Sequence, residues 1–227
     1  LIKSGAIGNP RLMIQNNIGG GDSIIVTPWM HYKKGGGPLL DVGVHYSYIV
    51  EYLMGEVDSV YAHTRLHEKV RKNAQGEIQA EAEDAVYASL LFKNGSIGQY
   101  VEDHAGHGQG LWQRSIYGSK GSINLPGDRS GKPINLIIDG KGMTKDDEML
   151  ELIPNYHLNN ITARFFGGER ICHYDLPFAE IDSALLAIEY YDYAEAIQNG
   201  RTPSVDPIMA TRSVALIYAM LESAKIG

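Results

Sequence analysis

An aspartate and a histidine four positions apart, Asp41 and His45, are the residues in this sequence best placed to do chemistry. They lie in the string GGGPLLDVGVHYSYIVEYLMG, which runs from Gly35 to Gly55. The glycines let the backbone approach a ligand closely, and the apolar spacing that follows predicts a helix ending at Gly55. Side chains four residues apart share one helix face. We expect Asp41 to accept hydrogen bonds from the free N–H groups at the helix start.

An imidazole beside a carboxylate is suited to removing the proton of an alcohol. The reference pKa of histidine is about 6.5, close to the pH at which most enzymes work. A neighbouring carboxylate can orient the ring and stabilise the imidazolium that forms. The pattern D-x-x-x-H taken alone also fits a helix-capping aspartate followed by a structural histidine, so the spacing alone leaves both interpretations open.

The complete string is more specific than the pair. GGG-P-L-x-D-x-G-x-H, followed by an apolar helix ending in L-x-G, resembles the substrate-domain signature of the Gfo/Idh/MocA oxidoreductases, the family of glucose–fructose oxidoreductase and inositol dehydrogenase. The resemblance implies that Asp41 and His45 are catalytic and face the hydroxyl group being oxidised. His45 would be the acid–base group, helped by a lysine on a nucleotide-binding domain.

The resemblance also implies how the chain is organised. LIKSGAIGNP at the N-terminus resembles the phrase that links the two domains of the family, and the C-terminal helix resembles the family's end. We therefore expect residues 1–227 to form a single substrate-binding and oligomerisation domain, with residues 1–9 as the tail of the linker. We expect the N-terminal dinucleotide-binding domain to be absent from this chain, which would be an inactive fragment by itself.

The glycine runs support that expectation. No G-x-G-x-x-G follows a predicted strand, because Gly19–Gly21 and Gly35–Gly37 lack both the spacing and the strand–helix context of a dinucleotide site. The family's E-K-P segment, which carries the lysine, is missing too. NAD or NADP would then be bound mainly by the missing domain.

Alternation, turn signals and helical spacing predict an α+β fold, with a large, mainly antiparallel sheet and helices packed on one face. Residues 69–83 are polar and predict a loop, and residues 141–168 show no clear pattern. Strands are predicted at 11–17, 57–67, 84–92, 96–103, 113–117, 122–125, 133–139 and 171–176, and two long helices at 178–198 and 206–225.

Composition limits the classes of partner. A formal net charge of -7 argues against nucleic acid or an anionic membrane. The single cysteine, Cys172, excludes an intramolecular disulfide and favours a reducing, cytoplasmic location. No apolar run approaches the roughly 20 residues of a membrane-spanning helix. Apolar residues occur at both odd and even positions of the predicted strands, so both faces of the sheet carry apolar side chains. We therefore expect a homodimer or homotetramer formed through the open sheet face.

Further candidate residues surround the motif. Trp29 either packs at the edge of the core or forms a surface that contacts a sugar or the nicotinamide. Strand ends of this kind reach the active site in related enzymes, which makes His104 and His107 polar wall residues; a metal site or simple solvent exposure are the alternatives, and we expect no metal. The predicted substrate-binding residues are Trp29, His31, His104, His107 and Tyr156, and the predicted cofactor contacts are Trp29, Gly36 and Gly37.

These observations predict an NAD(P)-dependent oxidoreductase acting on a secondary hydroxyl of a sugar, cyclitol or glycoside, since no side chain can accept a hydride. One alternative is a glycosidase that uses NAD for transient oxidation and elimination. The other is a non-catalytic sugar-binding or regulatory relative, which would be expected to lose the pair that this chain keeps.

Overall fold

The computed structural model covers residues 1–227, which fall into two compact units. Unit 1 consists of Leu1–Asn9 and Tyr117–Pro207, and unit 2 consists of Pro10–Ile116 and Ile208–Gly227. Two compact units can belong to one domain, so the expectation of a single domain stays a prediction.

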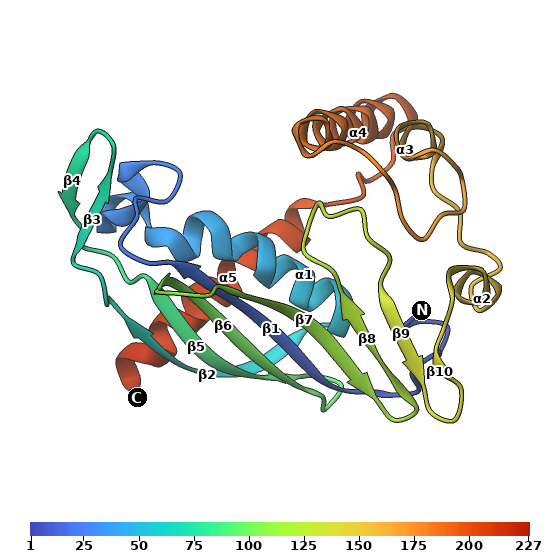
Figure 1. Cartoon of the computed structure of the whole chain (residues 1–227), viewed down its shortest axis with the longest axis horizontal. Helices are drawn as coiled ribbons and strands as arrows, with labels where there is room; N and C mark the ends of the chain where they lie inside the picture. The colour runs from blue at the N-terminus through green and yellow to red at the C-terminus, as the bar shows by residue number, and fades with distance from the viewer. The chain divides into compact units, whose positions relative to one another are not determined.

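Unit 2 is built on a sheet whose strands lie in the order β7-β1-β6-β5-β2 (Figure 1). The β2–β5 and β5–β6 pairs are antiparallel, whereas β1 and β6 are parallel. A separate antiparallel hairpin pairs β3 with β4. The strands are β1 (Pro10–Gly20), β2 (Val57–Arg65), β3 (Val70–Asn73), β4 (Gly76–Gln79), β5 (Ala85–Phe92), β6 (Ile97–Gly106) and β7 (Leu111–Gly118).

Two helices of unit 2, α1 (Val44–Met54) and α5 (Pro207–Ile226), cover the same face of this sheet (Figure 1). The Ser47 hydroxyl on α1 donates to the Ser213 carbonyl on α5 at 2.9 Å. The Ser223 hydroxyl on α5 accepts from the Ala62 N–H on β2 at 3.0 Å. The predicted α+β fold with helices on one face of a mainly antiparallel sheet is confirmed. Three short helical turns precede α1, namely η1 (Pro28–His31), η2 (Lys33–Gly35) and η3 (Leu39–Gly43).

Unit 1 combines three short antiparallel strands, in the order β10-β9-β8, with three helices. Its longest helix, α4, is followed by Gly200, a residue in the left-handed conformation. The elements are β8 (Gly121–Leu125), β9 (Asn135–Ile138), β10 (Gly142–Met143), α2 (Asp146–Glu151), α3 (Asn160–Phe166) and α4 (Phe178–Asn199).

Two sequence predictions were wrong. Residues 171–176 form no strand; next to them Arg170 donates to the carbonyls of Leu150 and Tyr156, so side chains rather than a ladder hold the segment. Within the predicted loop 69–83, residues 70–79 form the β3–β4 hairpin. Its sequence is polar because its main inward side chain is an arginine, Arg71, which is fully buried.

The helix-facing side of the unit 2 sheet is divided into an apolar end and a polar end. Register places Leu90 opposite Gly98 and Ala88 opposite Tyr100, and then Val86 opposite Glu102. Beyond this point the buried positions become polar. Buried polar side chains of this face include Gln15, Glu102, His104 and Arg114.

Candidate active site

The D-x-G-x-H string lies on the π-helical turn η3 and the first turn of α1. Pro38 already has helical backbone angles (φ -56°, ψ -32°), so the helical path begins before Asp41. No side chain caps either segment. The expected capping role of Asp41 was therefore wrong, because Asp41 lies within the turn and not at its start. A π turn inserted in a helix widens the helix locally and occurs frequently at functional sites.

The helical segment has two different sides. Asp41 is half-buried and His45 is exposed, and neither side chain forms a hydrogen bond or ion pair within the chain. Neither belongs to the set of buried residues with which the segment packs. Both groups are therefore free to contact a ligand. The residues buried on the opposite side are Leu39, Gly43, Ser47, Val50 and Met54.

Gly43, between the aspartate and the histidine, is the point at which the helix meets the sheet. A Cβ at this position would lie 2.6 Å from Glu102 Oε2 and 3.2 Å from the Tyr100 hydroxyl. Since real side-chain contacts are not that short, only glycine lets the turn approach this closely. The Tyr100 hydroxyl also lies 3.3 Å from the Gly43 carbonyl oxygen, to which it can donate. The glycine of the motif is thus explained by packing.

Beneath Gly43, three alternate residues of β6 form a buried polar row. Glu102 is fully buried, and both of its carboxylate oxygens are engaged. Oε2 accepts from the Tyr100 hydroxyl at 2.7 Å, and Oε1 lies 2.6 Å from His104 Nε2. Burial, followed by the charge of Glu102, raises the pKa of Tyr100 well above its usual value. His104, a predicted substrate contact, is 7% exposed.

A second polar cluster lies under the next helical residue, Tyr46. Its ring meets Trp112 edge-on at 5.5 Å, and the Arg114 guanidinium lies 4.9 Å from the centre of the Trp112 ring. Arg114 Nε donates to Gln15 Oε1 at 2.6 Å, and Asn17 Nδ2 donates to the Tyr46 hydroxyl at 3.2 Å. The helix that carries Asp41 and His45 is therefore fixed by directional bonds over its first turn.

His31, another predicted substrate contact, is buried, with 1% of its surface exposed. Its Nε2 accepts a hydrogen bond from the Ile25 N–H at 3.0 Å, so the ring holds the loop in front of it. Burial, followed by the charges of the nearby Arg71 and His104, lowers the pKa of His31 to about 4. A neutral ring is required for Nε2 to accept, and the low pKa keeps it neutral.

Trp29 and the glycines that follow it form a tight turn. The Trp29 side chain is 51% exposed and available for stacking. Gly36 and Gly37 have φ values of 92° and 79°, a region that favours glycine. A Cβ on Gly36 would lie 2.5 Å from Leu40 Cδ2, and one on Gly37 would lie 3.0 Å from Glu83 Oε1. The turn itself therefore requires both glycines.

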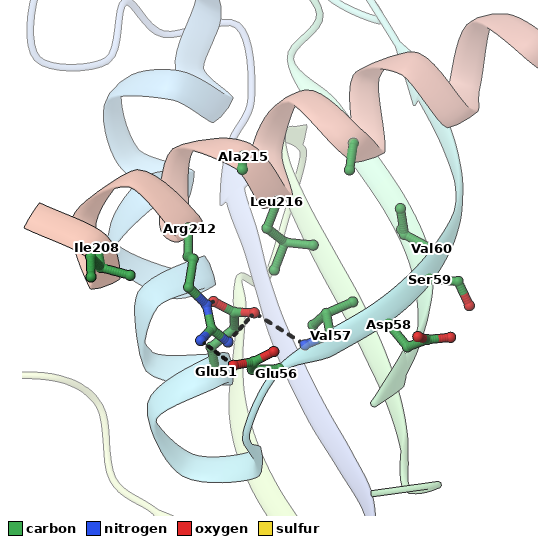
Figure 2. A pocket seen from close by; sticks show the side chains of 11 residues that line it. Glu51, Glu56, Val57, Asp58, Ser59, Val60, Ile208, Arg212, Ala215 and Leu216 are labelled. Carbon is green, nitrogen blue, oxygen red and sulfur yellow. Dashed lines mark hydrogen bonds and ion pairs between the residues drawn. The ribbon is translucent and has the colours of Figure 1, made fainter. Parts of the chain in front are cut away.

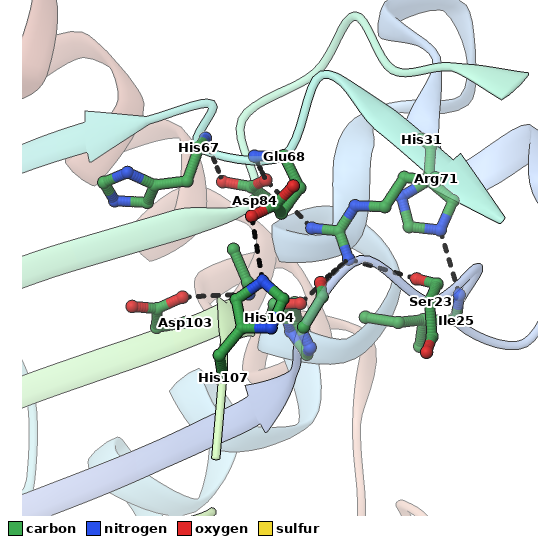
Figure 3. A network of polar contacts seen from close by, with 12 residues as sticks. Ser23, Ile25, His31, His67, Glu68, Arg71, Asp84, Asp103, His104 and His107 are labelled. Carbon is green, nitrogen blue, oxygen red and sulfur yellow. Dashed lines mark hydrogen bonds and ion pairs between the residues drawn. The ribbon is translucent and has the colours of Figure 1, made fainter.

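A buried ion pair anchors the neighbouring loops (Figure 3). Arg71 Nη2 donates to Asp84 Oδ2 at 2.9 Å, and both side chains are almost completely buried. Arg71 Nη1 donates to the carbonyls of Gly21, Ser23 and His104. Asp84 also accepts the N–H groups of His67 and Glu68. This network, here called the Arg71 anchor, fixes the loop after β1 and the end of β6.

The remaining predicted residues lie elsewhere. The His107 ring is exposed and pairs with Glu68 at 3.0 Å, so it is turned to a different partner from the one that holds His104. Tyr156 lies in unit 1 and is 37% exposed. No three His, Cys, Asp or Glu side chains come together in a group able to hold a metal ion.

Comparison with known families decides the class. A model of the oxidoreductase family's C-terminal alpha/beta domain matches residues 1–227. The chain belongs to the Gfo/Idh/MocA oxidoreductase family. The resemblance expected from the motif is confirmed. No curated protein matches the chain in sequence.

Solved structures share the fold of this family member. A levoglucosan dehydrogenase in complex with NADH and L-sorbose has a TM-score of 0.73 at 20% identity, over 99% of this chain and 59% of the other. An oxidoreductase from Agrobacterium radiobacter with NAD+, L-tartaric acid and magnesium has a TM-score of 0.68 at 22% identity, over 99% and 57%. An oxidoreductase domain protein from Kribbella flavida has a TM-score of 0.75 at 16% identity, over 100% and 60%. The chain thus spans less than two thirds of the length of each of these three chains.

Two cavities of unit 2 lie away from the motif. One, of about 450 Å³, lies between α5 and β2 (Figure 2). A smaller one of about 160 Å³ lies beside it. Arg212 lines both and is paired with Glu51 and Glu56, the latter at 2.7 Å. Neither cavity is lined by Asp41 or His45. Separately, no helix of the chain has both the length and the apolar character needed to cross a bilayer.

Of the residues beneath the motif, His104 was predicted from the sequence as a substrate contact, whereas Tyr100, Trp112 and Arg114 were missed. A signal existed, since in Tyr100-x-Glu102-x-His104 and Trp112-x-Arg114 every second residue of a strand is polar or aromatic on the side that should be apolar. Such a reversal in strands that must pack against a helix indicates a site or a polar network.

Proposed function

We propose that this chain supplies the substrate site of an NAD(P)-dependent oxidoreductase that oxidises a secondary hydroxyl of a sugar, cyclitol or glycoside. The observation that carries the proposal is the contrast within one helix. Asp41 and His45 are unbonded on its outer side, while its inner side is fixed to a buried polar row. Membership of the oxidoreductase family and the small polyhydroxylated ligands named for two structural neighbours support it.

In the proposed reaction His45 accepts the proton of the substrate hydroxyl, and the carbonyl forms as the hydride leaves the same carbon. NAD(P)+ would supply the hydride acceptor. Asp41 stabilises the imidazolium and holds a neighbouring hydroxyl. Of the substrate contacts predicted from the sequence, we retain the exposed side chains of unit 2, Trp29 and His107, as proposed contacts. His31 and His104 are 1% and 7% exposed, so we assign them to the support behind that surface.

The residues of this chain do not form a pyrophosphate cradle. Gly19–Gly21 lie at the end of β1, but the chain then continues into a loop and the short turn η1, and no α-helix begins there. We therefore assign the dinucleotide mainly to a domain outside this chain. Trp29, Gly36 and Gly37 remain the proposed contacts at its nicotinamide end.

The test is an assay of the enzyme together with its nucleotide-binding domain on a panel of sugars, cyclitols and glycosides. The proposal expects NADH or NADPH to accumulate with at least one secondary alcohol. Release of an aglycone without net NADH would identify the redox-assisted glycosidase instead. Saturable sugar binding without turnover of any substrate would contradict the oxidoreductase and indicate a binding protein.

We also propose that a second copy covers the open face of the unit 2 sheet, as a homodimer or homotetramer in the cytoplasm. Tyr61 and Ile97 are each 53% exposed on that face, and Leu91 is 43% exposed. A sheet face that stays exposed to water would be expected to carry polar residues at these positions. Sedimentation of the wild type and of Ile97→Lys tests this. We expect an oligomer in the wild type and dissociation in Ile97→Lys, and a monomer in both would contradict the proposal.

A further inference from the structure

The buried carboxylate beneath the motif has no assigned role. Glu102 is fully buried on β6, where an unpaired charge would cost several kcal/mol on the order-of-magnitude scale for buried ions. It is retained between two partners that can each donate one hydrogen bond, Tyr100 and His104. A leucine of similar volume would fill the space without that cost, so the carboxylate needs another explanation.

One side of Glu102 supports the turn that carries the catalytic pair. Its Oε2 lies 2.6 Å from the position that a Cβ on Gly43 would take, and the Tyr100 hydroxyl that donates to it also contacts the Gly43 carbonyl. Gly43 is two residues from Asp41 and two residues from His45. Glu102 therefore supports the backbone between the two side chains, at the junction of η3 and α1.

The other side of Glu102 determines the state of an imidazole. Its Oε1 lies 2.6 Å from His104 Nε2, and an ionised carboxylate can only accept. The proton of a neutral His104 ring must then reside on Nε2, which leaves Nδ1 as an acceptor. Carboxylates fix the tautomer and orientation of histidines in this way in many active sites.

We propose that Glu102 is a positioning residue that holds the Asp41–His45 turn and sets the tautomer of His104 at the same time. The proposal rests on the proposed function, since it assigns a consequence for turnover to a residue that does not touch the substrate. Its structural part, the tautomer, can be measured without any substrate.

The test uses Glu102→Gln, which keeps shape and volume, and Asp103→Asn as the matched control. Asp103 is the next residue of the same strand and points to the other face, where it accepts from the Tyr87 hydroxyl. In the enzyme with its nucleotide-binding domain, we expect Glu102→Gln to lower kcat about 10- to 100-fold with little change in KM, the range typical of supporting residues. Asp103→Asn is expected to stay within about twofold of wild type, as surface changes usually do.

The second readout is the imidazole nitrogen spectrum of the full chain labelled with 15N-histidine, with His104 assigned by His104→Gln. We expect a proton on Nε2 in wild type and in Asp103→Asn, and a changed tautomer in Glu102→Gln. A His104 proton on Nδ1 in wild type, or an unchanged tautomer in Glu102→Gln, would overturn the proposal. A normal kcat in Glu102→Gln, together with loss of activity in His45→Ala, would also overturn the proposal. If His45→Ala turns over normally, the proposed function fails while the spectrum still decides the role of Glu102.

Discussion

The motif helix and the Arg71 anchor lie in the same unit, yet they treat their charged groups in opposite ways. In the anchor, Arg71 and Asp84 are almost completely buried and their side chains make six hydrogen bonds, one to each other and five to backbone groups of the neighbouring loops. On the helix, Asp41 and His45 are half-buried and exposed, and neither has a partner in the chain. Groups that are already paired stabilise the fold, whereas unpaired groups at a fixed position are available to a substrate.

The largest expected effect on stability comes from breaking the anchor. Arg71→Met leaves Asp84 as a buried, uncompensated charge and releases three carbonyl groups, so we expect a loss of about 3 to 5 kcal/mol in the free energy of unfolding. Urea denaturation of the chain measures this. His45→Ala is the matched control and should cost less than about 0.5 kcal/mol, since it is exposed and unpaired. Equal losses in the two variants would remove the distinction between the regions.

A second effect is pH-dependent and belongs to the anchor's neighbour His31. Its pKa falls from 6.5 to about 4 on folding, so the unfolded chain binds the additional proton between these values. Stability is then fully present above pH 6.5 and decreases by about 2 to 3 kcal/mol as the pH falls to about 4. Denaturation at several pH values measures the slope. In His31→Gln, whose amide oxygen can still accept from Ile25, this part of the slope should disappear; an identical slope in both proteins would contradict it.

The fold was predictable where local signals were strong. Lys93-Asn94-Gly95 marks the β5–β6 hairpin, and Asn94 indeed bonds to the Ser96 N–H. The two long helices were placed to within a residue because their spacing is regular. The β3–β4 hairpin was missed because its buried side chain, Arg71, is charged, and charged residues usually indicate an exposed segment. Its partner Asp84 lies outside the hairpin, so the local sequence does not show that the charge is paired.

The site was predictable only in part. The D-x-G-x-H string located Asp41 and His45 on one helix, but the π turn has no sequence signal that propensities detect. The contact of Glu102 with the motif was not predicted, because it depends on Gly43, which is 59 positions away in the chain and adjacent in space. Such contacts are set by tertiary packing and not by local spacing.

A smaller effect should connect the two sides of the helix. Gly43→Ala places a methyl group against Glu102 and Tyr100, and overpacking of this kind costs about 1 to 3 kcal/mol. Unfolding measurements on Gly43→Ala, Glu102→Ala and the double variant give the coupling energy. We expect the double variant to recover part of the loss, because the carboxylate that the methyl group meets is gone. Strictly additive losses would show that Gly43 and Glu102 do not press on each other.

The most direct test of the account is the kcat of His45→Ala in the enzyme that includes its nucleotide-binding domain, measured together with the unfolding free energy of the same variant. General acid–base groups contribute about 100-fold or more, so we predict a kcat at least ~100-fold lower with stability unchanged. A kcat close to that of wild type in a fully folded variant would contradict the assignment of His45 as the proton acceptor.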